Sequence, residues 1–333
     1  MKKMFFASLV LALTSIMIFS ACQHGNGPET EPKGEVAVPG TRYICPMNCE
    51  HGKTYAHPGQ CPVCNMTLEP VKADEAGEQV EYFTEFKTDP AQLAAGKPGL
   101  LSFTPKIRGN ENAPVPLDLV HEKKMHLILV SDDLSRFDHV HPEFSEAGSY
   151  DIRVLGTGEN FSNGRGHNET RFETGGKYWA FADYKPLGGL NRVDRIELNI
   201  AGPSVKPVAY SQQKLHADID GYTVSLEGDH FSSGQQHIPV SIKKNGNAVD
   251  PAGFENYLGE KAHLVFIETA SKAFVHTHPS AKDGHLEIHT TFPAPGTYRG
   301  WLQFQTDGQV HTADFVIRVA AGSAGAHDDH HMH

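Results

Sequence analysis

Two sets of three histidines stand at matching positions in the two halves of the chain. Each set is one histidine followed 13 residues later by a His-x-His pair: His126 with His139 and His141, and His263 with His276 and His278. Alternate residues of a strand point to the same face about 6.6 Å apart, so each pair can offer two imidazoles to one ion. A hairpin would return the pair beside the first histidine. Three imidazoles so arranged suit Cu(II), Zn(II) or Ni(II).

These histidines belong to a longer internal repeat. Residues 126–142 align without a gap on residues 263–279, and three of the six identical positions are the histidines. Drift after a duplication is expected to lose histidines that merely fill space, which favours metal binding. The alternative is that they close one end of a domain and hydrogen-bond backbone groups. His311, at the start of a later strand of the second copy, is a candidate additional ligand there, and Asn191 takes its place in the first copy.

Other histidines are less informative. His285 and His289 alternate with Leu286 and Ile288, which predicts that they face solvent. His121 and His237 have no partner at an interpretable spacing. The last residues combine four histidines with aspartates, a composition typical of a flexible metal-scavenging tail: His327, His330, His331 and His333.

The cysteines form a second candidate site. All five lie in the first 64 residues, and four of them follow the pattern Cys45-x3-Cys49-x11-Cys61-x2-Cys64, with Met47 and Met66 interleaved. Two close thiol pairs joined by a short loop can converge on one tetrahedral ion, because thiolates bind Zn(II) and Cu(I) strongly. The alternatives are two disulfides in an oxidising compartment, or a purely structural zinc site.

This cysteine segment resembles a known family. The residues from Tyr43-Ile-Cys45-Pro-Met47 to Cys61-Pro-Val-Cys64-Asn-Met66 are similar to the heavy-metal-binding domain found beside copper and silver efflux adaptors and at the N-terminus of copper-transporting ATPases. The resemblance covers residues 43–70. It implies capture of a soft metal ion and, by association, an efflux adaptor or a metallochaperone as recipient. Asn48-Cys49 stands where members often have His-Pro, so Cys49 is a candidate replacement for a histidine ligand.

The N-terminus reads as a targeting segment. Lys2 and Lys3 precede an apolar run at 4–19 that is too short for a typical membrane span, and the run closes with Phe19-Ser-Ala-Cys22. This end resembles a bacterial lipobox, and the alternatives are an ordinary signal peptide with an incidental cysteine or an uncleaved anchor. The resemblance implies removal of residues 1–21, lipidation of Cys22 and, because Gln23 follows, sorting to the outer membrane, on its periplasmic or surface face.

The elements expected to position these residues are strands. Residues 78–320 carry short β-type runs separated by turn residues, without a helical period. The size and rhythm of each repeat fit an immunoglobulin-like antiparallel sandwich. We therefore predict an all-β protein with two tandem sandwiches. The expected segments are a signal peptide at 1–21, a flexible tether at 22–41, a small Cys-rich metal knuckle at 42–72, sandwiches at 78–202 and 213–320, and a His-rich disordered tail at 321–333.

Composition narrows the function. The net charge is −11 without a basic block, which argues against nucleic acid as a partner. No G-x-S-x-G elbow, phosphate-cradling glycine loop or H-E-x-x-H helix is present. The chain has no cysteine after residue 64, so the sandwiches lack the thiolate that a blue-copper site needs. We expect a non-enzymatic, membrane-anchored lipoprotein that binds copper or zinc for sequestration, buffering or hand-over to efflux. The alternatives are an adhesion or assembly protein with a structural knuckle, and a copper redox enzyme.

Overall fold

The protein is all-β, as predicted. The computed structural model describes residues 41–45, 53–62, 66–72, 80–161 and 168–322, all within one compact unit at 37–333. Its regular structure is entirely β-strand apart from a single 3-10 turn at Pro251–Gly253. Among these residues no helix has the length and apolar character needed to cross a membrane. Cys22 and the predicted signal lie outside the described residues, as do the tether up to residue 40 and the tail from residue 323.

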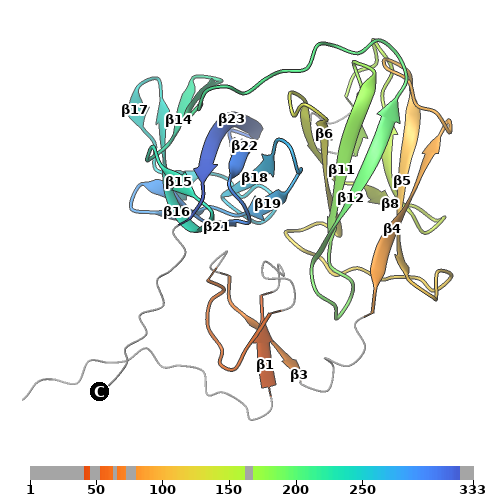
Figure 1. Cartoon of the computed structure of the whole chain (residues 1–333), viewed down its shortest axis with the longest axis horizontal. Helices are drawn as coiled ribbons and strands as arrows, with labels where there is room; N and C mark the ends of the chain where they lie inside the picture. The colour runs from red at the N-terminus through yellow and green to blue at the C-terminus, as the bar shows by residue number, and fades with distance from the viewer. Residues whose placement is uncertain (1–40, 46–52, 63–65, 73–79, 162–167, 323–333) are drawn as a thin grey trace, which may run out of the picture. The chain divides into compact units, whose positions relative to one another are not determined.

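The cysteine segment folds around a small antiparallel sheet (Figure 1). The central strand β1 (Thr41–Ile44) pairs with β2 (Thr54–Tyr55) on one side and with β3 (Glu69–Lys72) on the other. Before β3, the amide of Cys61 donates to the carbonyl of Met66 over 2.7 Å. Cys61 lies in one buried cluster with Tyr43 of β1.

The first sandwich consists of two sheets whose strands pair antiparallel, apart from one short parallel pair. One has the strand order β10-β9-β5-β4, with β8 also paired to β9, and the other has the order β12-β11-β6-β7. The bounds of the first sheet are β4 Tyr82–Asp89, β5 Gly99–Ile107, β8 Glu143–Phe144, β9 Tyr150–Val154 and β10 Glu169–Thr170. Those of the second are β6 Met125–Ser131, β7 Phe137–Val140, β11 Gly176–Tyr184 and β12 Arg192–Ile200.

The second sandwich has corresponding sheets. Their strand orders are β13-β14-β16-β21-β20, with β17 paired to β16, and β15-β23-β22-β18-β19. The bounds of the first sheet are β13 His216–Ile219, β14 Tyr222–Leu226, β16 Gly234–Lys244, β17 Asn247–Ala248, β20 Ser280–Lys282 and β21 His285–Phe292. Those of the second are β15 Phe231–Ser232, β18 Ala262–Glu268, β19 Phe274–Thr277, β22 Gly296–Thr306 and β23 Gln309–Ala320.

Strands β6 and β18 are buried on both faces. In β6, Leu127 and Leu129 enter the core of the first sandwich, whereas Ile128 and Val130 enter a separate apolar cluster that also contains Val265 of β18. Strands covered on both sides read as continuous apolar runs rather than as alternating ones. The sequences of β6 and β18 have this character, and the two sandwiches accordingly pack against each other through the sheet faces that carry these strands.

Aromatic stacks link the two sandwiches reciprocally. Phe137 of β7 stacks on Trp301 of β22, with ring centroids 4.5 Å apart. Phe274 of β19, the repeat equivalent of Phe137, stacks on Phe181 of β11 at 4.8 Å. A contact that recurs with the roles of the halves exchanged is the pattern of an interface between two copies related by a twofold axis.

We predict that Gly300→Ala destabilises the second sandwich. A Cβ at Gly300 would lie 2.4 Å from Cε1 of Phe266, a side chain with no exposed surface, so the core would have to shift. Overpacking of this kind costs about 1–3 kcal/mol in the free energy of unfolding. Chemical denaturation measures the change. Gly253→Ala is the matched control, because a Cβ there meets nothing within 4 Å, and equal stability of the two variants would contradict the prediction.

Candidate metal centre

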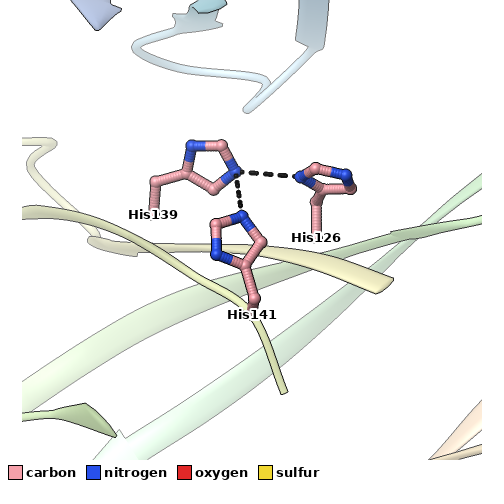
Figure 2. A group of neighbouring side chains, drawn as sticks. All are labelled: His126, His139 and His141. Atoms are coloured by element: carbon pink, nitrogen blue, oxygen red, sulfur yellow. Dashed lines mark hydrogen bonds between the residues drawn. The ribbon is translucent and has the colours of Figure 1, made fainter. Parts of the chain in front are cut away.

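The first histidine triad is assembled by the hairpin of β6 and β7. The two strands pair antiparallel, with Ile128 opposite His139, which returns the His-x-His pair beside His126. Nδ1 of His126 lies 3.2 Å from Nε2 of His139, and Nε2 of His141 lies 3.3 Å from that same atom (Figure 2). Three ring nitrogens therefore converge on one point.

The second triad is built in the same way. Strands β18 and β19 pair with Val265 opposite His276. The ligand atoms of His263, His276 and His278 all lie within 4.8 Å of one another. Nδ1 of His263 and Nε2 of His276 and His278 are buried and find no hydrogen-bond partner among the described residues. Leaving one buried polar atom unsatisfied costs about 1–3 kcal/mol, so three aimed at one place indicate a site for an ion.

A repeated turn orients the first histidine of each triad. Nε2 of His126 donates to the carbonyl of Val120 over 3.0 Å, and Nε2 of His263 donates to the carbonyl of Tyr257 over 2.8 Å. Each carbonyl opens a four-residue hairpin turn, at 120–123 and 257–260, whose two central residues both have positive φ. Because Nε2 carries the proton in both rings, Nδ1 presents its lone pair to the triad.

The His-x-His residues are oriented from the opposite sandwich. Nδ1 of His139 donates to Oε1 of Gln303 over 2.7 Å, and Nδ1 of His276 donates to Oδ2 of Asp183 over 2.9 Å. Their Nε2 atoms are therefore lone-pair donors as well. It follows that the facing nitrogens of His126 and His139 both present lone pairs, and only a proton or a metal ion between them can hold them together.

The two triads face each other. The ring centroid of His139 lies 5.9 Å from that of His263, and the rings of His126 and His276 are 6.2 Å apart. His121, in the turn before the first triad, packs on His278 with centroids 3.9 Å apart, and its Nε2 is buried without a hydrogen-bond partner in the described part of the chain. The sequence gave no partner for His121 at an interpretable spacing. Its equivalent in the second copy is Leu258, and this difference between the copies could have identified His121 as a candidate.

Burial lowers the pKa of four of the six triad histidines and so favours their neutral form. Desolvation, followed by the neighbouring His276, lowers the pKa of His126 to about 4. Burial first, and then nearby histidines, also holds the pKa of His139, His263 and His278 well below the usual value. Burial alone would raise the pKa of Asp183, but its hydrogen bonds from His276 and Asn191 act in the opposite direction, and this pKa is lowered. Neutral imidazoles are the form that binds metal.

His311 lies away from the second triad. Its Nδ1 contacts Oδ2 of Asp220 at 2.8 Å, and its Nε2 contacts Oγ1 of Thr306 at 2.9 Å. The physical reason is the alternation of the sheet: His311 shares a face with Ala313 and the sandwich core, whereas His263 points to the opposite face. His311 is thus separated by the sheet from the ligands it was expected to join.

A third group lies on the outer face of β21. Leu286 and Ile288 enter the core. His285 and His289 therefore face outward, as predicted, but they are half-buried rather than solvated. Glu287 is buried between His285, at 2.5 Å, and His237 of β16. His237 lies directly opposite His289, with ring centroids 4.7 Å apart. His237, for which the sequence offered no partner, and His285, which was predicted to face solvent, thus share one carboxylate.

The knuckle brings the first cysteine of each pair together. Cys45 and Cys61 are buried in one small cluster with Tyr43 and Leu68. Met66 is half-buried, and its carbonyl accepts from the amide of Cys61. The other predicted ligands lie outside the described residues: Cys49, Cys64 and Met47.

We predict that the metal-free protein loses stability as the pH falls below about 6.5. The unfolded histidines titrate near pH 6.5, whereas His126 in the folded protein titrates near 4. The unfolded state therefore binds more protons in this window, and acid favours unfolding. Thermal unfolding with a chelator, at pH 7.5 and 5.0, measures the effect. A melting temperature that does not fall at pH 5.0 would count against neutral, buried triads.

Comparisons with known proteins give two family matches. Residues 42–71 match the heavy metal binding domain, in agreement with the resemblance of the cysteine segment. Residues 73–201 and 217–321 each match a family described as a domain of unknown function, DUF8832. Among curated proteins no match is found.

Likenesses to solved structures are distant. Three N-terminal domains of the bacteriophage RB49 outer capsid protein Hoc are 12% identical (TM-score 0.19), covering 72% of this chain and 59% of that one. Escherichia coli alpha-2-macroglobulin activated by porcine elastase is 11% identical (TM-score 0.23), covering 81% and 26%. The chain thus spans less than two thirds of either. Neither likeness indicates a function, but the DUF8832 matches cover more than half of the chain, and the protein belongs to the DUF8832 family.

Proposed function

We propose that this protein is a non-enzymatic heavy-metal-binding lipoprotein of the bacterial envelope that holds copper or zinc. The observation that carries the proposal is that the triad histidines direct the lone pairs of their ring nitrogens toward a common point. In the first triad, the N–H groups of His126 and His139 are taken by outer oxygens, so their facing nitrogens need a cation between them. The match of residues 42–71 to the heavy metal binding domain is an independent support.

The donor set favours a borderline divalent ion at each triad. Three neutral imidazoles suit Cu(II) and Zn(II), and a three-ligand set leaves one coordination position open. The proposed ligand atoms are Nδ1 of the first histidine and Nε2 of each His-x-His residue. At the knuckle, Cys45 and Cys61 with Cys49 and Cys64 would bind Cu(I) or Zn(II) as thiolates, and Met47 or Met66 would assist.

Burial favours storage over turnover. The residues of the first triad are 3–4% exposed and His263 is 1% exposed. His276 and His278 are half-buried as residues, but their Nε2 atoms are buried. Catalysis at a metal requires an open position that a substrate can reach, whereas an enclosed ion exchanges slowly. The buried triads are therefore suited to retaining metal, and the small knuckle to capturing it. Sequestration, buffering or hand-over to efflux are the roles that combine the two.

The proposed location in the cell rests on the N-terminal segment. Lipidation at Cys22 would tether the protein to a membrane, and Gln23 after it favours the outer membrane. The association of the heavy metal binding domain with efflux systems makes an efflux adaptor or a metallochaperone the proposed recipient of the metal.

We predict about two copper ions per chain when the triads alone are available, one for each set of three histidines. The background chain has the four knuckle cysteines replaced by serine and the tail histidines replaced by alanine. After copper or zinc loading and removal of unbound ion, mass spectrometry of the metal gives the stoichiometry. Replacing His139 and His141 by alanine should remove one ion, and replacing His276 and His278 as well should remove both.

Two further variants serve as controls for this measurement. His216→Ala removes an exposed histidine that contacts Ser225 and should leave the stoichiometry unchanged. His237→Ala reports any ion held by the group around Glu287. A background chain that stays folded and metal-free would overturn the proposal, and the adhesion or assembly alternative would take its place.

A further inference from the structure

We infer that the two triads form one binuclear centre, in which each sandwich supplies the ligands of one ion and the residue that orients a ligand of the other ion. The inference rests on the proposed function for the presence of the ions. It adds that neither site is complete within its own sandwich, so the metal affinity of each half depends on its docking to the other half.

The first crossed contact runs from the second sandwich to the first triad. Oε1 of Gln303 accepts the Nδ1 proton of His139 over 2.7 Å, while Nε2 of the same amide donates to Oγ1 of Thr312 over 3.1 Å. The amide of Gln303 is thus held at both ends, by His139 and by Thr312. Gln303 thereby holds the lone pair of His139 Nε2 toward the first ion.

The second crossed contact runs the other way. Oδ2 of Asp183 accepts the Nδ1 proton of His276 over 2.9 Å, and Oδ1 accepts from Nδ2 of Asn191 over 2.7 Å. A carboxylate behind a ligating histidine raises the basicity of the ring more than a neutral amide does. The second triad is therefore expected to hold a divalent ion more tightly than the first.

The two contacts occupy equivalent places in the fold. Asp183 of β11 pairs with His126 of β6, and Gln303 of β22 pairs with His263 of β18. Each orienting residue thus lies beside the first histidine of the triad in its own sandwich, and its side chain contacts a histidine of the triad in the other sandwich. Together with the aromatic stacks, this makes the centre part of the sandwich–sandwich interface.

Linkage follows from this arrangement. Docking preorients His139 and His276, so it raises the affinity of both triads for metal. By thermodynamic reciprocity, metal binding then favours the docked arrangement to the same extent. The ion-binding centre would act as a metal-dependent clasp between the two sandwiches.

The crossed dependence can be measured one triad at a time in the full-length background chain defined above. With His276 and His278 replaced by alanine, only the first triad remains, and Gln303→Ala should weaken its copper affinity by about 10- to 100-fold. Gln303→Glu, which keeps an acceptor for His139, should restore it. With His139 and His141 replaced instead, Asp183→Ala should weaken the second triad by a similar factor. Competition with a chelating indicator gives each affinity.

Each outcome has a definite meaning. Unchanged copper affinity in a folded Gln303→Ala or Asp183→Ala protein would overturn the crossed arrangement while leaving the proposed function intact. If neither single-triad chain binds copper at all, the proposed function fails as well. Circular dichroism and melting temperature establish folding, and His216→Ala in both backgrounds is the matched control with no expected change.

A spectroscopic measurement tests the proximity of the ions. Two Cu(II) ions in facing triads should couple magnetically, so the fully loaded chain should show less electron paramagnetic resonance intensity than its copper content, or a half-field signal. Each single-triad chain should show one isolated Cu(II). A loaded chain whose spectrum equals the sum of the two single-triad spectra would overturn the binuclear centre.

Discussion

The reciprocal packing of the two sandwiches is the constraint on which the site depends. Strands β6 and β18 bury both faces, and the apolar cluster of Ile128, Val130 and Val265 covers the outer one. The triads lie on these same faces, because His126 and Ile128 are two residues apart on one strand. Burial of the histidines, their lowered pKa and the crossed hydrogen bonds all follow from this interface. Without it, each triad would be a group of solvated histidines at a sheet surface.

The polar content of this interface changes its energetics. Apolar contacts and aromatic stacks favour association, but the buried nitrogens of His121, His276 and His278 have no partner within the described structure. Such atoms oppose association by the cost of their lost hydration. The interface is therefore well matched in shape and incomplete in its polar contacts. Coordination of the triad nitrogens by an ion would satisfy them and leave Nε2 of His121 as the remaining one of these three nitrogens without a partner.

The sequence predicted the features that are set locally. The 13-residue spacing within each copy predicted the hairpins that bring the triads together, and the alternating pattern predicted the outward face of β21. The crossed partners could not be predicted, because Gln303 is 164 residues from His139 and no local pattern relates them. His311 was misplaced for a related reason: the repeat alignment gave its position along the chain but not the sheet face on which the triad would form. The pairing of the sandwiches became visible only in three dimensions.

The reciprocity of the interface also bears on the history of the chain. A single ancestral sandwich with these contacts would have associated with an identical copy, and one residue type would have stood at both orienting positions. Fusion of two copies removes that identity requirement. The carboxylate of Asp183 opposite the amide of Gln303, and His121 opposite Leu258, are differences that only a fused pair can hold in a fixed order. A fused pair of this kind thus keeps a reciprocal interface while its two halves carry different residues at equivalent positions.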